Sequence, residues 1–181
     1  MDRCERRVFV IKTHCWEKFA PRLIRAYAYT GTYTENLFKR LKQKQALSYG
    51  TQSEVIAKVL EKAKQQHEKQ KQILGHHTKF LEFRTKPLKY ERNSIFQKGV
   101  DVQLAVDLVS HAHMGNFDVA VLCSGDLDLL ESVRAVKNLG KKVITMAHNE
   151  NIAYQMKRES DSFINISELA DAELDAFSIK S

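Results

Sequence analysis

The residues best suited to chemistry form the segment Ser124-Gly125-Asp126-Leu127-Asp128, in which two carboxylates stand beside a hydroxyl group. The segment directly follows an apolar run at residues 118–123, which is typical of a buried parallel strand. Open α/β sheets place their reactive groups at the carboxyl ends of such strands. Carboxylate oxygens suit a hard cation such as Mg²⁺ or Mn²⁺, which can activate a water molecule and stabilise negative charge on a phosphoryl group.

A second acidic pair, Asp101 and Asp107, lies upstream on a predicted helix. The beginnings of helices in a parallel sheet lie at the edge where the strands end, so we expect Asp101 to approach Asp126 and Asp128. Three neighbouring carboxylates repel one another unless they are protonated or bridged by a cation, and a divalent ion resolves that repulsion. Asp107 is a candidate ligand, a supporting partner of the ligands or a solvated residue, and its spacing does not decide among these roles.

Helix capping is the alternative explanation for these aspartates. Asp is favoured at the N-cap and in the first turn of a helix, where it accepts hydrogen bonds from free backbone N–H groups. Asp126, Asp128 and Asp101 all stand near predicted helix beginnings. Each of them taken alone therefore fits a structural role as well as a metal-binding one.

Positive charge is concentrated in the middle of the chain. Residues 35–98 contain 15 Lys and Arg against 6 Asp and Glu, whereas the whole chain has a net charge of +7. A basic region beside an acidic metal site suits a phosphodiester substrate, although a solvated lysine-rich helix would give the same composition.

Size and composition indicate a globular protein. The 181 residues suit one domain, and 43% hydrophobic with 28% charged residues is ordinary for a chain of this class. No apolar stretch approaches the roughly 20 residues of a membrane-spanning helix, so we expect no membrane partner. The 3 cysteines are odd in number and widely spaced, which predicts a reduced, cytoplasmic protein.

Strands alternate with helices along the chain, which predicts a largely parallel sheet in an α/β fold. The expected strands are residues 7–11, 23–29, 79–84, 118–123, 142–146 and 163–166. The expected helices are residues 34–46, 51–74, 100–114, 127–139 and 151–160. Thr30-Gly31 predicts a turn, and Thr51-Gln52-Ser53-Glu54 has the spacing of a capping box. Residues 64–72 are polar all round, so we expect this half of the helix to project into solvent.

The acidic segments resemble the NYN domain, specifically its LabA-like branch. The resemblance rests on Lys98-Gly99-Val100-Asp101-Val102, on residues 104–108 and on residues 117–128, and it extends over about residues 23–167. It implies a PIN-like three-layer α/β/α fold with a mainly parallel central sheet, in a single domain over residues 1–181 with an acidic helix or tail at residues 168–181. It also implies a Mg²⁺- or Mn²⁺-dependent endoribonuclease that acts on RNA, and a homodimer as an additional form.

The resemblance also implies roles for individual residues. Asp101, Asp126 and Asp128 match the acidic positions of the family and would be catalytic metal ligands, with Asp107 as a further ligand. We expect substrate contacts from the following residues: Ser124, Lys98, Lys86 and Arg84.

The front of the chain departs from the family pattern. Family members end their first strand with a metal-binding Asp, in a phrase close to Phe-Ile-Asp-Gly-x-Asn. Here the divergent residues 1–22 contain Val10-Ile11-Lys12-Thr13-His14, which has no acid at that place. The sequence therefore leaves two functions open, a metal-dependent endoribonuclease and a catalytically silent module that binds RNA or protein. A phosphatase based on Asp126-Leu127-Asp128 fits less well, since the haloacid-dehalogenase-type enzymes place this motif after their first strand.

Overall fold

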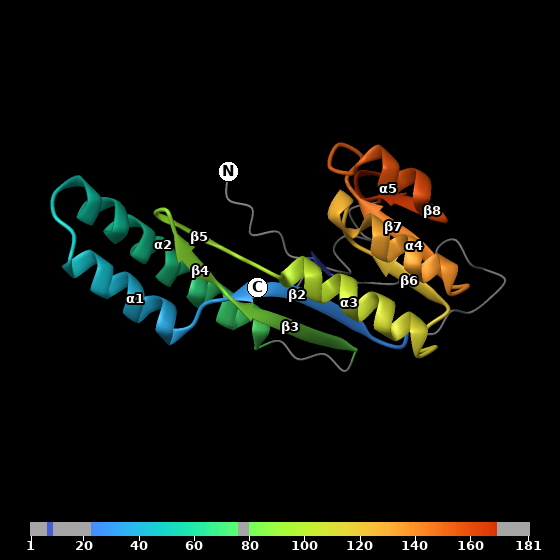
Figure 1. Cartoon of the computed structure of the whole chain (residues 1–181), viewed down its shortest axis with the longest axis horizontal. Helices are drawn as coiled ribbons and strands as arrows, with labels where there is room; N and C mark the ends of the chain where they lie inside the picture. The colour runs from blue at the N-terminus through green and yellow to red at the C-terminus, as the bar shows by residue number, and fades with distance from the viewer. Residues whose placement is uncertain (1–6, 9–22, 76–79, 170–181) are drawn as a thin grey trace. The chain divides into compact units, whose positions relative to one another are not determined.

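The computed structural model describes residues 7–8, 23–75 and 80–169, and it has the mixed α/β fold that the sequence predicts. The chain divides into two compact units. Among the described residues, the first unit comprises residues 7–8, 23–75 and 80–104, and the second comprises residues 105–169. Figure 1 labels the helices and strands of both units. Predictions for residues 9–22, 76–79 and 170–181, including the end of the first strand and most of the acidic tail, lie outside the described residues.

The sheet of the first unit has the strand order β1-β2-β3. β1 (Arg7–Val8) is antiparallel to β2 (Ala26–Thr32), whereas β3 (Leu81–Pro87) pairs with β2 in parallel. The predicted turn at Thr30-Gly31 is wrong, because β2 continues through Gly31. Gly31 serves here as a site of close packing, since a Cβ atom on it would lie 2.9 Å from Cγ of Leu88.

Two helices of the first unit form a hairpin and bury a common core (Figure 1). α1 (Glu35–Ala46) and α2 (Thr51–Leu74) confirm the predicted helices. The predicted capping box is wrong, since Thr51 is already the first helical residue and Gly50 is the N-cap with φ of 58°. The core contains the following buried residues: Leu37, Leu41, Ile56, Leu60, Ala63 and Leu88.

The second half of α2 does not project into solvent as the sequence predicts. The side chain of Gln70 donates a 2.6 Å hydrogen bond to the carbonyl of Gly31 and accepts one of 3.2 Å from the N–H of Tyr33. The ring of His67 contacts the rings of Tyr33 and Phe38 at centroid distances of 5.9 and 5.4 Å. These contacts hold the polar half of α2 against the end of β2.

A short β-hairpin in the first unit is absent from the sequence prediction. It consists of β4 (Lys89–Glu91) and β5 (Ser94–Phe96), joined by Arg92 and Asn93 at φ of 47° and 63°. A two-residue connection with two positive φ angles is the turn that matches the twist of a hairpin.

The helix α3 (Val100–His113) confirms its prediction, and the boundary between the two units falls within it, after Leu104. The second unit contains a parallel sheet with the order β6-β7-β8. Its strands are β6 (Val119–Leu122), β7 (Lys142–Ala147) and β8 (Ser162–Asn165). A 3₁₀ turn at Leu127–Leu129 leads into α4 (Leu130–Asn138), so the predicted βαβ unit from β6 to β7 is confirmed.

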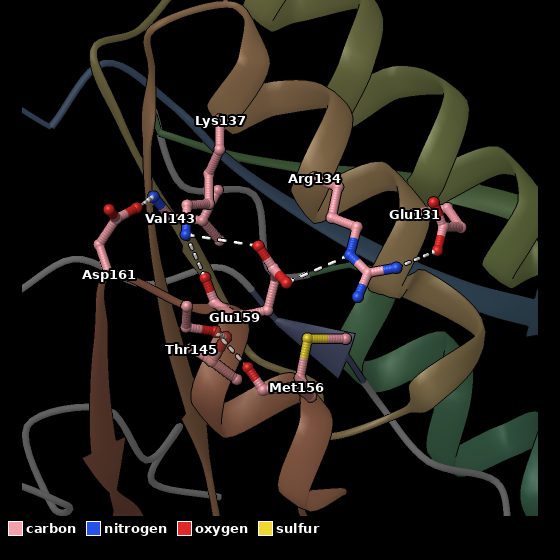
Figure 2. A network of polar contacts seen from close by, with 9 residues as sticks. Glu131, Arg134, Lys137, Val143, Thr145, Met156, Glu159 and Asp161 are labelled. Carbon is pink, nitrogen blue, oxygen red and sulfur yellow. Dashed lines mark hydrogen bonds and ion pairs between the residues drawn. The ribbon is translucent and has the colours of Figure 1, made fainter.

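A polar network links the elements that follow β6 (Figure 2). Arg134 of α4 binds Glu159 of α5 (Tyr154–Glu159) at 3.1 Å, and Lys137 of α4 donates to the backbone carbonyl of Glu159. Asp161 accepts a 2.8 Å hydrogen bond from the N–H of Val143, which attaches the segment before β8 to β7. These bonds hold α4, α5 and the two strands together around the buried side chain of Met156.

Candidate active site

The loop after β6 places two carboxylates at the end of a buried strand, as the sequence predicts. Ala120, Val121 and Leu122 are all buried, so the end of this strand is firmly fixed in the core of the second unit. The chain then leaves the sheet, and Ser124, Asp126 and Asp128 follow within a few residues of one another. Of the predicted site residues, the structure brings these three together in one loop.

Ser124 supports this loop from within. It is only 8% exposed, and its Oγ accepts a 3.3 Å hydrogen bond from the backbone N–H of Asp126. A small hydroxyl residue can form such a turn because its side chain reaches the backbone two residues ahead. In this structure the hydroxyl orients Asp126, while its predicted contact with a substrate stays a prediction.

Gly125 fixes the position of the loop against a distant segment. A Cβ atom at this position would lie 2.6 Å from Cα of Ile152 and would collide with the backbone oxygen of Asn151. The carbonyl of Gly125 also accepts a 3.1 Å hydrogen bond from the N–H of Ala153. Only glycine allows the backbone of residues 151–153 to approach the acidic loop so closely.

Asp126 is the N-cap of the 3₁₀ turn, so the capping alternative is correct for this residue. Its Oδ1 accepts a 3.1 Å hydrogen bond from the backbone N–H of Asp128. A carboxylate has about four acceptor positions on its two oxygens, so one capping bond is compatible with a further ligand. Asp126 is half-buried, whereas Asp128 is exposed.

The other two predicted ligands lie on α3. Asp101 is in the first turn of the helix and belongs to the first unit, whereas Asp107 is half-buried and belongs to the second. Within residues 7–8, 23–75 and 80–169, no three His, Cys, Asp or Glu side chains are grouped so that they could hold a metal ion. The roles of Asp101 and Asp107 as ligands therefore stay predictions.

The loop itself fits a small hard cation. Mg²⁺ is commonly bound through one or two carboxylates, with water molecules and substrate phosphates completing its coordination. Asp126 and Asp128 supply two such carboxylates. Asp126 is already oriented, because its N–H donates to Ser124 Oγ and its carboxylate accepts from the N–H of Asp128. The chemistry of these donors suits Mg²⁺ or Mn²⁺ better than Zn²⁺, which prefers nitrogen and sulfur ligands.

The predicted substrate-binding cations all belong to the first unit. Lys86 and Lys98 are exposed. Arg84 forms a 2.7 Å ion pair with Glu82, and its guanidinium group lies 5.0 Å from the centre of the Tyr27 ring. Burial alone would raise the pKa of Glu82, but hydrogen bonds and positive charge from Arg25 and Arg84 hold that pKa below its usual range. Arg84 therefore has a structural role on β3 that the sequence does not reveal.

A surface depression of the second unit lies outside the predicted site. It is lined by Val109, Ser110, His113, Met114, Ala135, Asn138 and Leu139. None of these residues belongs to the acidic loop, and their side chains are mostly apolar. The depression is therefore distinct from the loop after β6.

No helix within the described ranges is long and apolar enough to cross a membrane.

Comparison with known proteins identifies the family. The sequence profile of the NYN domain matches residues 14–168. No protein of curated function shows significant sequence similarity to the chain. Among solved structures, a protein of unknown function from Vibrio parahaemolyticus is similar to this chain with a TM-score of 0.44 and 23% sequence identity. That match covers 59% of this chain and 62% of the Vibrio protein.

The acidic loop after β6 and the helix α3 both lie within the region that the family profile matches. NYN domains form part of the PIN-like nuclease superfamily, whose members typically use divalent metal ions. The chain belongs to the NYN domain family.

Proposed function

We propose that the protein is a metal-dependent endoribonuclease of the LabA-like branch, which cleaves RNA phosphodiester bonds in the cytoplasm. The acidic loop is the observation on which this proposal rests. The loop carries two carboxylates, Asp126 and Asp128, at the end of a buried strand. The hydroxyl of Ser124 supports it from within, and Gly125 lets a distant backbone segment pack closely against it. Membership of a nuclease superfamily gives this arrangement its expected chemistry.

Each loop residue would have a distinct part in the reaction. Asp126 and Asp128 would hold Mg²⁺ or Mn²⁺, and Asp107 of the same unit would support them. The bound ion would activate a water molecule and stabilise the charge that develops on the phosphoryl group. Ser124 would hold the backbone of Asp126, and the N–H of Asp128 would keep the Asp126 carboxylate in place, because a ligand that is already oriented needs no reorganisation during the reaction.

Substitution of Asp126 by Asn tests the proposal. The Asn side-chain oxygen can still accept the hydrogen bond from the N–H of Asp128, so the loop should keep its shape while losing one negative charge. We expect Mn²⁺-dependent cleavage of a labelled single-stranded RNA to slow by roughly 100-fold or more, because a metal ion contributes several kcal/mol of transition-state stabilisation. Cleavage without added metal, in EDTA, should be absent.

Asp118→Asn is the matched control. Asp118 precedes the same strand at its opposite end, where it is exposed and forms a 2.9 Å ion pair with Lys141. Its substitution removes the same charge, and an exposed ion pair contributes only about 0–1 kcal/mol to stability. Equal cleavage by the wild type and the Asp126→Asn variant would refute the proposed role of the loop.

A catalytically silent RNA-binding module is the second candidate. The absence of an acid in Lys12-Thr13-His14 favours it, because family members carry a metal ligand at that place. RNA binding that persists in EDTA, without cleavage in Mg²⁺ or Mn²⁺, would establish this second function instead.

A further inference from the structure

The helix α5 begins directly beside the acidic loop. The N–H of Ala153, the residue before the helix, donates a 3.1 Å hydrogen bond to the carbonyl of Gly125. The N–H of Lys157 donates in turn to the carbonyl of Ala153 at 3.1 Å, so Lys157 stands one helical turn beyond this contact. Because helical side chains lean toward the start of their helix, the long side chain of Lys157 extends back toward the loop.

The ammonium group of Lys157 is held in a fixed place on the surface. It donates a 3.1 Å hydrogen bond to Oδ1 of Asn149 and lies 4.5 Å from the centre of the Phe163 ring. The backbone N–H of Asn149 donates at 3.2 Å to the side chain of Asn165, which ties the turn after β7 to the end of β8. Lys157 is nevertheless exposed. Because an ammonium group has three N–H donors, this one can still bind a ligand from solvent.

Two carboxylates are close to Lys157 or its partner Asn149 in sequence, but neither pairs with the lysine. Glu150 in the turn after β7 and Asp161 after α5 are both exposed, and within the described ranges Lys157 forms no ion pair with them. Lys137 of α4 differs, since it lies 3.6 Å from the carboxylate of Glu159. The surface around Lys157 is therefore not strongly positive, and this lysine is distinguished by its fixed position.

Tyr154 stands on the same side of α5 as Lys157, because residues three positions apart on a helix are neighbours. It is the first residue of the helix, directly after Ala153, and it is 74% exposed. Single-stranded nucleic acids bind to such pairs, since their bases stack on aromatic rings and their phosphates contact cations. The first turn of α5 thus presents an exposed ring and a fixed cation beside the acidic loop.

We propose that Tyr154 and Lys157 form a contact surface for single-stranded RNA at the edge of the acidic loop. The ring of Tyr154 stacks on one base, and the ammonium group of Lys157 binds a phosphate of the same strand. These contacts accept any sequence, because every base has a flat face and every nucleotide linkage has a phosphate. The proposal rests on RNA as the substrate of the proposed function, but the contacts require neither metal nor cleavage.

Binding measured in EDTA tests these contacts without cleavage. Fluorescence anisotropy of a labelled single-stranded RNA of about 20 nucleotides would give the Kd over a series of salt concentrations. We expect Lys157→Gln to weaken binding about fivefold near 0.1 M salt and to lower the log–log salt slope by about 0.7, the contribution of one phosphate contact in a single strand. Lys157→Arg keeps the charge and should keep the slope. Tyr154→Ala should weaken binding at least about fivefold with little change in slope, because stacking is not an ionic contact.

Arg158→Gln and Tyr49→Ala are the matched controls. Arg158 is the next residue of α5, exposed and about 100° further round the helix, whereas Tyr49 is 89% exposed but belongs to the first unit. Both controls should bind RNA with nearly the wild-type Kd. Wild-type binding by Lys157→Gln or by Tyr154→Ala, or equal weakening in the controls, would overturn the proposal. So would a wild-type protein that binds no RNA, or a Lys157→Arg variant as weak as Lys157→Gln, which would indicate a structural role.

Mn²⁺-dependent cleavage separates these contacts from the proposed nuclease activity. Because the contacts hold the RNA equally before and during the reaction, Lys157→Gln and Tyr154→Ala should raise KM and leave kcat nearly unchanged. If RNA binding depends on both residues but Mn²⁺ produces no cleavage, the contacts stand and the nuclease activity fails. If the wild type cleaves RNA and both variants keep its Kd and KM, the nuclease activity stands and the contacts fail.

Discussion

Gly125 has no side chain, yet its packing determines the positions of Asp126 and Asp128. Its missing Cβ lets the backbone of Asn151 and Ile152 pack against the acidic loop. The aspartates on either side of Leu127 are therefore anchored by a contact from a segment more than twenty residues away in sequence.

The substitution Gly125→Ala should destabilise the protein by about 1–3 kcal/mol, because the added methyl group would meet backbone atoms that cannot move aside cheaply. Chemical denaturation would measure the loss, and Mn²⁺-dependent cleavage should fall with it as the loop shifts. Unchanged stability would show that the 151–153 backbone adapts and that the loop needs no such anchor.

Gly115 provides the contrast, since its φ of 70° and its open surroundings make it a conformational glycine. Gly115→Ala should cost about 1 kcal/mol through backbone strain. Asn tolerates this backbone region, so Gly115→Asn should be nearly neutral, whereas Gly125→Asn should be at least as harmful as Gly125→Ala.

Among the elements, α2 is held on its strand by a side-chain amide. Gln70 bonds to both Gly31 of β2 and Tyr33, the residue that follows this strand. The amide thus occupies the place that a peptide group of a neighbouring strand would take.

Replacing this amide tests its contribution. Gln70→Met keeps a similar length but leaves the Gly31 carbonyl and the Tyr33 N–H without their bonds to the amide, so we expect a loss of about 2 kcal/mol in unfolding free energy. Gln65→Met, on the exposed face of the same helix, is the control and should change stability little. A loss of equal size in both variants would mean that the amide bonds contribute nothing specific.

The link between α4 and α5 should respond to pH. The hydrogen bond from Arg134 is the largest cause that lowers the pKa of Glu159, and Lys137 adds to it. A carboxyl group whose pKa is lower in the folded state stabilises the fold above its unfolded pKa of about 4.3 and loses this effect as the pH falls through the folded value.

The variant Glu159→Gln should therefore be less stable than the wild type at neutral pH, and the difference should shrink as the pH falls through the lowered pKa of Glu159 in the folded protein. Urea denaturation at a series of pH values would measure it. Glu150→Gln, which removes an exposed carboxylate from the turn after β7, is the control. A difference between wild type and Glu159→Gln that is constant with pH would exclude the ion pair as its source.

For the molecule as a whole, charge follows the division into units. Residues 23–75 and 80–104 contain 15 Lys and Arg against 7 Asp and Glu, whereas residues 105–169 contain 6 against 9. The first unit is thus suited to hold a polyanion, and the second unit bears the carboxylates proposed to bind metal. The charge count of the sequence predicts this separation.

Periodic segments are the parts of the fold that the sequence predicts well. The helices α1 and α3 and the βαβ unit from β6 to β7 have clear apolar patterns, and the position of Asp126 and Asp128 follows from them. The β4–β5 hairpin is missed because three-residue strands are too short to show alternation.

The errors arise where a polar or flexible residue has a tertiary contact. The hydrophobicity pattern predicts that Gln70 and His67 are exposed to solvent. In the structure Gln70 forms hydrogen bonds to the backbone, and the ring of His67 packs against another ring. Gly31 has the appearance of a turn residue, but glycine is required there because the side chain of Leu88 leaves no room for a Cβ atom. The sequence also fails to predict how the acidic loop is packed. Gly125 contacts residues 151–152, and no local sequence pattern links these two segments.

Gln70 and Gln97, which bond to the backbone of Gly31, also bear on the association of this protein with other copies of itself. The N–H of Gly31 donates to the side chain of Gln97, and its carbonyl accepts from Gln70. Peptide groups left open along a strand are a template on which a strand of another molecule can add, and repeated addition leads to fibrils. Because the side chains of Gln97 and Gln70 already occupy both backbone groups of Gly31, a strand of another molecule cannot pair with this residue without displacing them.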